Sequence, residues 1–400
     1  MPDLSRRASQ LGTENAFVVL GEVAELQAQG KEIISFCIGQ PDFPTPDHIS
    51  LAGIRAIADG HHGYTPSPGI QPLREAVAKY FTRTRRVAVT ADEVVCGCGG
   101  KPFIGYTILS VTDYGEGHEV IYPNPGFPIY QSQIVANGAV PVPLHLREGN
   151  GFVFDLDDLR SKLNDKTRLL ILCSPQNPTG SVISHGDLEE LAGILADYPD
   201  VWVYSDEVYS GLVYDGPFES IAAVEGMRER TIIVDTASKT YAMTGWRIGY
   251  AANKALAPAF TRWVTNTDSC PAHPNQWAVV EALNGPQDAS EAMRKVFEQR
   301  RTRIVEGLNA IDGIRCQTPG GAFYVWPNVT EVCKMTGIAD SEELRKRLLN
   351  EAGVAILADI HFGSRVEGDG EHVRFSYASS LEDIHNGLEK IADFIGKNKK

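Results

Sequence analysis

The amino-acid sequence predicts an α/β fold, with a large domain built on a mostly parallel β-sheet flanked by helices and a smaller α+β domain from the two chain ends. Two observations carry this prediction. Short apolar runs alternate with segments of helical periodicity up to about residue 286, which is typical of a sheet covered by helices on both faces. Beyond that point the dense strand signal stops, and a long amphipathic segment leads into a shorter mixture of strands and helices.

The strands of the large domain are expected at a series of short apolar runs. In chain order these runs are EVVCGC, EVIYP, RLLILC, VWVYS, TIIVD and RIGYAA, which begin at Glu93, Glu119, Arg168, Val201, Thr231 and Arg247. Helical spacing of apolar residues between and beyond them is clearest at Leu73, Val77 and Phe81 and again at Leu381, Ile384, Leu388 and Ile391. Strands that alternate with helices in this way indicate a parallel sheet.

The same pattern divides the chain into three segments. Residues 46–286 are expected to form the large domain. Residues 288–310, DASEAMRKVFEQRRTRIVEGLNA, predict one long helix, so residues 287–400 are expected to hold an interdomain helix and the small C-terminal domain. Residues 1–45 contain no strand–helix unit of their own, and they are expected to complete the small domain.

Composition narrows the class of protein. Hydrophobic residues make up 43% and charged residues 22% of the chain, as in an ordinary globular protein. The formal net charge is −14 and no dense Lys/Arg stripe is present, so nucleic acid is not an expected partner. Seven scattered cysteines without a CxxC pair indicate buried thiols rather than a metal site. No apolar run reaches the roughly 18 residues of a membrane span, and the N-terminus lacks a signal core, which predicts a cytoplasmic protein.

Polar side chains follow three of the expected strands. Asn177 comes after RLLILC, Asp206 and Tyr209 come after VWVYS, and Thr236 and Lys239 come after TIIVD. Taken singly, each has an ordinary explanation as a turn, loop or surface group. Ligands of open α/β sheets bind beyond the carboxyl ends of the strands, so the coincidence predicts one site that holds an amide, a carboxylate, a phenol and an amine.

A glycine-rich segment, GCGGKPFI, follows the first of these strands and precedes a helical segment. Gly99, Gly100 and Lys101 would place free backbone N–H groups at a helix N-terminus, where anions bind. The Walker A pattern is not met, because Val95 and Pro102 stand at two of its required positions. A phosphate site is therefore expected, without nucleotide triphosphatase activity.

The sequence resembles a known family, the class I/II aminotransferases of fold type I, which include aspartate aminotransferase. The resemblance covers nearly the whole chain. The motifs that carry it are, in order, IGQPDFPTP, GYTPSPGIQPLREAVA, GCGGKP, YPNPGFPIY, SPQNPTG, SDEVY, SKTYAMTGWRIGY, GGAFYVWP and VRFSYA. It implies a seven-stranded sheet in the large domain, pyridoxal 5'-phosphate as cofactor, and a homodimer with a composite active site.

The resemblance also implies roles for residues around the cofactor ring. Lys239 matches the lysine that forms a Schiff base with the cofactor and acts as general base at the substrate Cα. Asp206 matches the carboxylate that keeps the pyridine nitrogen protonated. Tyr209 and Asn177 match groups that hydrogen-bond the 3-oxygen of the ring, and Phe127 stands where an aromatic residue stacks on it. Lys239, Asp206 and Tyr209 are therefore the predicted catalytic residues.

The phosphate and substrate contacts follow from the same resemblance. The phosphate is expected to bind Gly99, Gly100, Lys101, Thr236 and Arg247, and Tyr64 matches a tyrosine that reaches the phosphate of the neighbouring subunit. The substrate α-carboxylate is expected to bind Arg374 through a two-pronged contact, with Gly39 and Asn177 beside it.

Two departures from the family pattern concern substrate recognition. Residues 357–363, LADIHFG, replace a turn that contains Pro-Gly in relatives, with Ala358 and Asp359 at those positions. Residues 263–270 lack the arginine that many dicarboxylate-specific members carry, which predicts a broad substrate range. His273 stands between Ala272 and Pro274. Its position is consistent with a structural role and also with a place near the site.

The function implied is transfer of an α-amino group from an L-amino acid to a 2-oxo acid, with 2-oxoglutarate as the expected acceptor, by a ping-pong mechanism. A C–S lyase or an amino-acid oxidase on the same fold is the alternative, because the substrate carbanion is common to all of these reactions. The cofactor-binding domain of a transcription regulator is disfavoured by the acidic balance and by the absence of room for a helix-turn-helix segment before residue 46.

Overall fold

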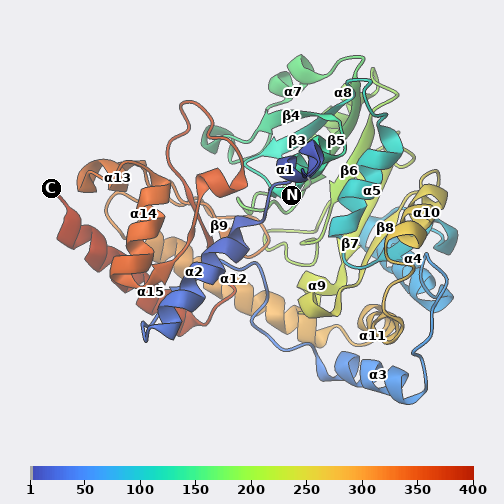
Figure 1. Cartoon of the computed structure of the whole chain (residues 1–400), viewed down its shortest axis with the longest axis horizontal. Coiled ribbons are helices and arrows are strands. Elements are labelled where there is room, and N and C mark those ends of the chain that lie inside the picture. Colours follow the sequence, from blue (N-terminus) through green and yellow to red (C-terminus); the bar gives the residue numbers. More distant parts are fainter. Residues whose placement is uncertain (1–2) are drawn as a thin grey trace.

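The computed structural model describes residues 3–400. Within that range the strands form a seven-stranded sheet in the order β2-β8-β7-β6-β5-β3-β4, a three-stranded sheet β11-β12-β9, and a two-stranded sheet β1-β10 (Figure 1). The strands of the central sheet are β2 (Val94–Gly97), β3 (Glu119–Asn124), β4 (Val140–His145), β5 (Thr167–Cys173), β6 (Trp202–Asp206), β7 (Thr231–Thr236) and β8 (Gly249–Ala252).

The central sheet is mostly parallel, which confirms the predicted fold class. Strands β4, β3, β5, β6 and β7 pair in parallel, whereas β8 is antiparallel to both β7 and β2. The expected apolar runs coincide with every strand except β4. That strand has the sequence VPVPLH and is only partly buried, and it pairs with β3 alone. Prolines are tolerated at such an edge position. The two prolines of β4 interrupt the apolar pattern expected of a strand, and they are also typical of an edge strand.

Helices cover both faces of the central sheet. They include α4 (Gln71–Arg85), α5 (Lys101–Val111), α6 (Ile129–Ala136), α7 (Leu156–Lys162), α8 (His185–Leu195), α10 (Ala257–Thr267) and α11 (His273–Asn284). α3 (Asp47–Ala58) packs on α11 instead, and the short α9 (Ala237–Thr240) follows the end of β7. On β5, Leu169 and Ile171 pack with α5, α6 and α10, while Leu170 and Leu172 pack with α7 and α8. Because successive side chains point to opposite faces, burial on both faces explains the unbroken apolar run.

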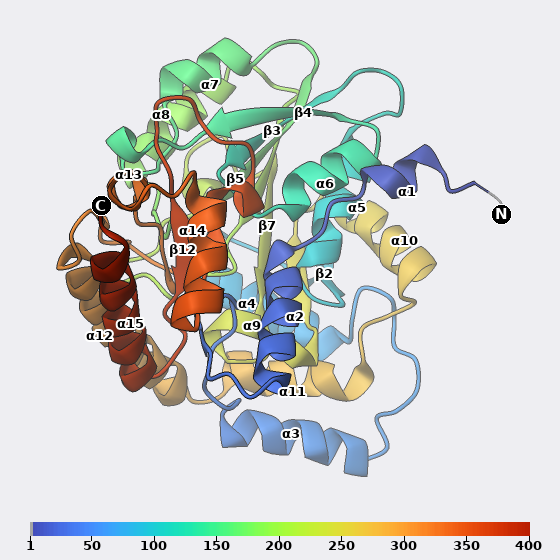
Figure 2. The same ribbon diagram turned by 60° about the vertical axis from the view of Figure 1, so that its left-hand side comes forward.

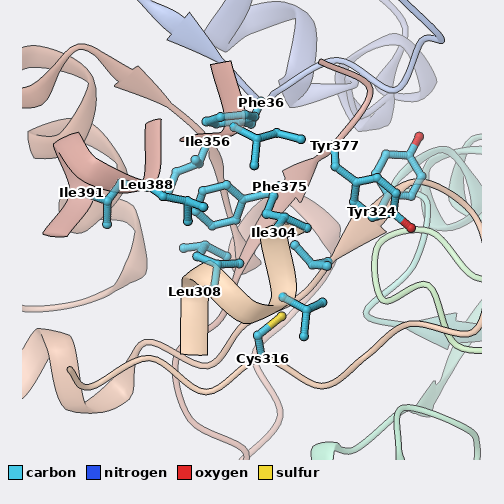
Figure 3. Close-up of a cluster of buried hydrophobic side chains, with 14 of the residues drawn as sticks. Phe36, Ile304, Leu308, Cys316, Tyr324, Ile356, Phe375, Tyr377, Leu388 and Ile391 are labelled. Atoms are coloured by element: carbon cyan, nitrogen blue, oxygen red, sulfur yellow. The ribbon is translucent and has the colours of Figure 1, made fainter. Parts of the chain in front are cut away.

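The C-terminal part begins with the long helix α12 (Asp288–Asn309), as the sequence predicts. It continues through β9 (Tyr324–Val325), α13 (Thr330–Thr336), α14 (Ser341–Arg347), β10 (Val354–Ala355), β11 (Leu357–Ala358), β12 (Val373–Ser376) and α15 (Leu381–Asn398). Ile304 and Leu308 of α12 share one apolar cluster with Leu388 and Ile391 of α15 and with Phe375 of β12 (Figure 3). The apolar faces of both helices therefore close over the three-stranded sheet.

The N-terminal segment contacts both parts of the chain. It holds α1 (Arg6–Gln10), α2 (Asn15–Ala28) and β1 (Ile34–Ser35). β1 pairs in parallel with β10, whereas α1 lies beside α6 (Figure 2), and the backbone N–H of Gly12 donates to Ser132 Oγ on α6 at 2.9 Å.

The division of the chain at residues 45 and 286 stays a prediction. Across residues 3–400, no helix combines the length and apolar character needed to cross a membrane.

A buried cluster of charges joins α4 to the ends of β6 and β7. The Arg85 guanidinium, only 2% exposed, donates from Nε to Glu207 Oε2 at 2.7 Å and from Nη2 to Asp235 Oδ2 at 2.5 Å. The same Nη2 donates to Ser210 Oγ at 2.7 Å. Glu207 directly follows Asp206, and Asp235 directly precedes Thr236. Arg85 therefore holds together the two strand ends that carry predicted site residues.

We expect Arg85→Met to lower the free energy of unfolding by about 3–5 kcal/mol, because it leaves two buried carboxylates without their cation. Urea unfolding of the two proteins measures the difference. Arg83→Met on the same helix is the matched control, since Arg83 is exposed and its replacement should change stability by less than about 0.5 kcal/mol. Equal stability of Arg85→Met and the parent would contradict the assigned role.

Candidate active site

The carboxyl ends of β5, β6 and β7 open into one cavity of about 490 Å³. These strands are parallel neighbours, so the polar residues that follow them meet there, as the sequence predicts. Of the predicted site residues, the cavity is lined by Gly39, Gly100, Lys101, Phe127, Asn177, Asp206, Tyr209, Thr236, Lys239, Arg247 and Arg374. Gly99 and Tyr64 are the predicted residues that do not line it.

Lys239 lies on the short helix α9, which follows β7 directly. Its Nζ donates a 2.5 Å hydrogen bond to the carbonyl oxygen of Gly39 and lies 5.9 Å from the ring centroids of Tyr209 and Phe323. Burial lowers the pKa of the Lys239 amine to about 8, against the opposing effect of the Glu14 carboxylate. A larger fraction of the amine is therefore neutral near pH 7, and the neutral form is the nucleophile.

Asp206 ends β6, is buried and lines the cavity. The Tyr130 hydroxyl donates to its Oδ2 at 2.6 Å, whereas its Oδ1, among the residues described, has no hydrogen-bond partner. Burial raises the pKa of the Asp206 carboxyl to about 6. A buried carboxylate oxygen without a donor is costly, and it fits a cationic N–H group on a bound ligand.

A group of backbone N–H donors and a guanidinium lines another part of the same cavity and forms an anion cradle. Gly100 and Lys101 stand at the N-terminus of α5, and Thr236 caps α9 by accepting from the N–H of Ser238 at 3.2 Å. A Cβ at Gly100 would lie 2.7 Å from Thr236 Cγ2, so only glycine leaves this space open. The arrangement fits a phosphate group.

Gly99 makes room for the Arg247 side chain rather than lining the cavity itself. A Cβ at Gly99 would lie 2.2 Å from Arg247 Nη2, and its φ of +91° is one that other residues rarely adopt. Arg247 Nη1 donates to Thr244 O at 2.9 Å and Nη2 to Cys98 O at 3.4 Å. The absence of a side chain at Gly99 thus lets Arg247 take its place at the anion cradle.

Arg374 lies on β12 and enters the cavity from the C-terminal part of the chain. Its Nη1 donates to Asn177 Oδ1 at 2.9 Å and its Nη2 to Cys37 O at 2.5 Å. The Tyr324 and Phe362 rings lie 4.5 and 4.7 Å from its Cζ. Its Nε, buried and without a hydrogen-bond partner in the described chain, is one free donor for a carboxylate on a bound molecule.

Sequence reasoning missed several cavity residues, of which Glu14, Tyr130 and Tyr324 matter most. Glu14 Oε2 accepts from Lys101 Nζ at 2.8 Å, so a carboxylate from the N-terminal segment pairs with a cation of the glycine-rich loop. Lys101 Nζ also lies 5.4 Å from the Phe127 ring centroid. Tyr130 and Tyr324 stand inside recognised motifs, yet no local pattern indicates their partners, which are distant in the sequence.

Tyr64 and His273 lie outside the cavity. The Tyr64 side chain is 90% exposed, so it does not contact the site of its own chain, and its predicted contact with a neighbouring subunit stays a prediction. His273 begins α11, where its Nδ1 lies 3.2 Å from Gly63 O and its ring 4.9 Å from that of His61. These contacts favour the structural reading of His273.

The residues of the cavity fit pyridoxal 5'-phosphate. The unpartnered oxygen of Asp206 suits a protonated pyridine nitrogen, and the cradle at Gly100 and Arg247 suits a phosphate. The Lys239 amine, with its lowered pKa, suits reaction with an aldehyde. Phe127 supplies an aromatic face within the same cavity.

Comparison with known proteins agrees with this fit. The family described as "Aminotransferase class I and II" matches residues 31–391. An aspartate aminotransferase of Bacillus sp. (strain YM-2) is 36% identical over 395 residues, which is 98% of this chain and 99% of the relative. The crystal structure of an aspartate aminotransferase from Rhizobium meliloti superposes with a TM-score of 0.94 at 33% identity over 100% of both chains. The Thermus thermophilus aspartate aminotransferase with maleate gives 0.91 at 35% identity, covering 98% of this chain and 100% of that one. The protein therefore belongs to the class I and II aminotransferases, fold type I enzymes that use pyridoxal 5'-phosphate.

Proposed function

We propose that this aminotransferase moves the α-amino group of L-amino acids to a 2-oxo acid, with 2-oxoglutarate as an acceptor, by a ping-pong mechanism. The observation that carries the proposal is the position of Arg374, whose side chain lines the same cavity as Lys239. Amino acids and 2-oxo acids share the carboxylate next to the reacting carbon. One guanidinium can therefore bind the donor and then the acceptor in turn.

The residues of the chain would divide the chemistry as follows. When bound, the cofactor withdraws the electron pair released at the substrate Cα and carries the amino group between the two half-reactions. Lys239 would take the proton from Cα of the donor and, in the second half-reaction, deliver a proton to Cα of the acceptor, a task suited to an amine whose pKa burial lowers to about 8. Asp206 accepts the hydrogen bond that keeps the ring nitrogen protonated, with Tyr130 holding its other oxygen.

The remaining predicted residues would hold the cofactor and substrate in place. Phe127 would lie against the ring, and Tyr209 and Asn177 would bind its 3-oxygen. The backbone of Gly100 and Lys101 would bind the phosphate, together with the side chains of Thr236 and Arg247. Gly39 would lie beside the substrate, since its carbonyl already accepts from Lys239.

We further propose a homodimer whose subunits complete each other's sites. Tyr64 is 90% exposed, and Leu51, Ile54 and Ile57 on α3 are 62%, 62% and 63% exposed. Such an apolar helix face supports burial by a second copy of the chain, and Tyr64 follows α3 closely enough in sequence to enter the same interface. A cytoplasmic location is proposed as well, supported by seven free cysteines.

We expect Lys239→Ala to lose the yellow colour of covalently bound cofactor and to lower turnover by about 10²- to 10⁴-fold, the contribution of a general base alone. Absorption spectra and borohydride reduction followed by peptide mass mapping measure the change. In the parent protein the reduced adduct should map to Lys239. An adduct at Lys101, the other lysine of the cavity, would overturn the assignment.

Asp206→Asn should leave the fold intact but slow Cα deprotonation by about 10²- to 10³-fold, because the neutral amide no longer favours a protonated ring nitrogen. The measurement is a single turnover of cofactor-loaded enzyme with an amino donor, beside an unfolding curve that confirms an intact fold. Near-parental rates in Asp206→Asn would assign the ring nitrogen to another partner.

We expect a broad donor range, with neutral or aromatic amino acids accepted alongside aspartate and glutamate. Residues 263–270, which the family resemblance relates to the substrate side chain, contain no Lys or Arg, and none of them lines the cavity of this chain. Neutral hydrogen-bonding groups discriminate about 10- to 100-fold less than a cation would. The measurement compares kcat/KM for aspartate, alanine, phenylalanine and glutamate with one acceptor.

One result would contradict the broad donor range, and another would contradict amino transfer itself. A preference for aspartate over alanine beyond about 10⁴-fold, near the limit of matched polar recognition, would place a cation against the substrate side chain. Lys101 is then the group to test, by Lys101→Met. Release of ammonia without stoichiometric amino transfer would instead indicate a C–S lyase or an amino-acid oxidase.

A further inference from the structure

Tyr324 is a buried residue of the cavity that has no role in the function proposed above. It lies on β9 at the edge of the apolar cluster (Figure 3) and is 1% exposed. Its hydroxyl lies 2.7 Å from the hydroxyl of Tyr209, the residue proposed to bind the 3-oxygen of the cofactor. Its ring lies 4.5 Å from Cζ of Arg374. One side chain thus contacts both a cofactor-binding and a substrate-binding residue.

The two hydroxyls have a restricted choice of partners. Burial raises the pKa of both Tyr209 and Tyr324, so each carries its proton near pH 7. Within the described chain, the one hydrogen bond of either hydroxyl is the bond between them. The backbone of Gly39 closes the space beside Tyr324, since a Cβ there would lie 2.0 Å from its hydroxyl oxygen.

This pair permits two arrangements of protons. If Tyr209 donates to Tyr324, the Tyr209 proton is already engaged, and Tyr209 can only accept hydrogen bonds from the cofactor. If Tyr324 donates to Tyr209, the Tyr209 proton is free to bind an anionic oxygen in the cavity. An anionic oxygen selects the second arrangement, and a hydroxyl that accepts one hydrogen bond becomes a stronger donor in the next.

We propose that Tyr324 is a positioning residue whose hydroxyl donates to Tyr209 and thereby directs the Tyr209 proton to the 3-oxygen of the cofactor. The proposal rests on the proposed function, in which Tyr209 binds that oxygen. By stabilising the anionic oxygen, the pair lowers the proton affinity of the bound cofactor. The charged groups that act on the pair are Arg374, Glu14 and Lys239.

The ring and the hydroxyl of Tyr324 have separable tasks. Tyr324→Phe removes the hydroxyl but keeps the ring against Arg374. It should therefore change the titration of the bound cofactor while leaving KM for the amino donor within about twofold, since the cation–π contact remains.

The test is a pH titration of the absorption of the bound cofactor in the holoenzyme. Tyr324→Phe should raise the midpoint by about 0.5–1 pH unit, roughly a three- to tenfold increase in proton affinity, because Tyr209 without an incoming hydrogen bond is a weaker donor and leaves the 3-oxygen more basic. Tyr377→Phe is the matched control. Tyr377 is 0% exposed and its hydroxyl donates to Ala322 O at 3.0 Å, so its loss should leave the midpoint unchanged.

A double-mutant cycle with Tyr209→Phe tests whether the effect passes through Tyr209. In the Tyr209→Phe background, Tyr324→Phe should no longer shift the midpoint. An unmoved midpoint in Tyr324→Phe, or an equal shift in both backgrounds, would overturn the proposal. Failure of the proposed function is a distinct result, since the absorption band would then be absent or would persist in Lys239→Ala.

Discussion

The Arg85 guanidinium ties together the two strand ends on which the site is built. Glu207 and Asp235 are almost completely buried, and two carboxylates at such depth are tolerated only with a cation and further hydrogen bonds around them. Each carboxylate adjoins a site residue, Asp206 on β6 and Thr236 on β7, so the ion cluster fixes both strand ends relative to α4. One arginine between two carboxylates also leaves negative charge behind the cavity. Asp235 and Glu207 both add to the raised pKa of Asp206, which makes the Asp206 oxygen a better partner for a cationic ligand.

Burial brings the pKa values of the two principal titrating groups of the cavity, Lys239 and Asp206, closer together. The pKa of the Lys239 amine falls to about 8, while that of the Asp206 carboxyl rises to about 6. Both shifts have desolvation as their largest cause, so burial makes the Lys239 amine easier to deprotonate and the Asp206 carboxylate more basic. The carboxyl ends of parallel strands suit this arrangement, because they present polar groups at the edge of an apolar sheet whose rigidity holds them in place.

The parts of the fold that could be predicted from sequence are those with a local signal. β5, β6 and β7 are buried on both faces and therefore appear as unbroken apolar runs, and the residues at and after their carboxyl ends bring Asn177, Asp206 and Lys239 into the cavity. β4 was missed because its prolines and partial exposure remove that signal. Tyr209 and Tyr324 are 115 residues apart, and Glu14 and Lys101 are 87 apart. No periodicity connects such residues, since their proximity arises only when the C-terminal part and the N-terminal segment pack against the sheet. The roles assigned to individual site residues through family resemblance stay predictions.

The ion pair between Glu14 and Lys101 has a consequence for how small molecules enter the cavity. Both side chains are partly exposed, at 26% for Glu14 and 44% for Lys101, and exposed pairs of this kind contribute at most about 1 kcal/mol. That is less than twice the thermal energy, so the contact breaks and re-forms continually at ordinary temperature. This ion pair is salt-sensitive and adds little to the attachment of the N-terminal segment, which also rests on the β1–β10 pairing and on the buried residues of α2. A molecule that enters the cavity can therefore separate Glu14 from Lys101 at little cost in binding energy.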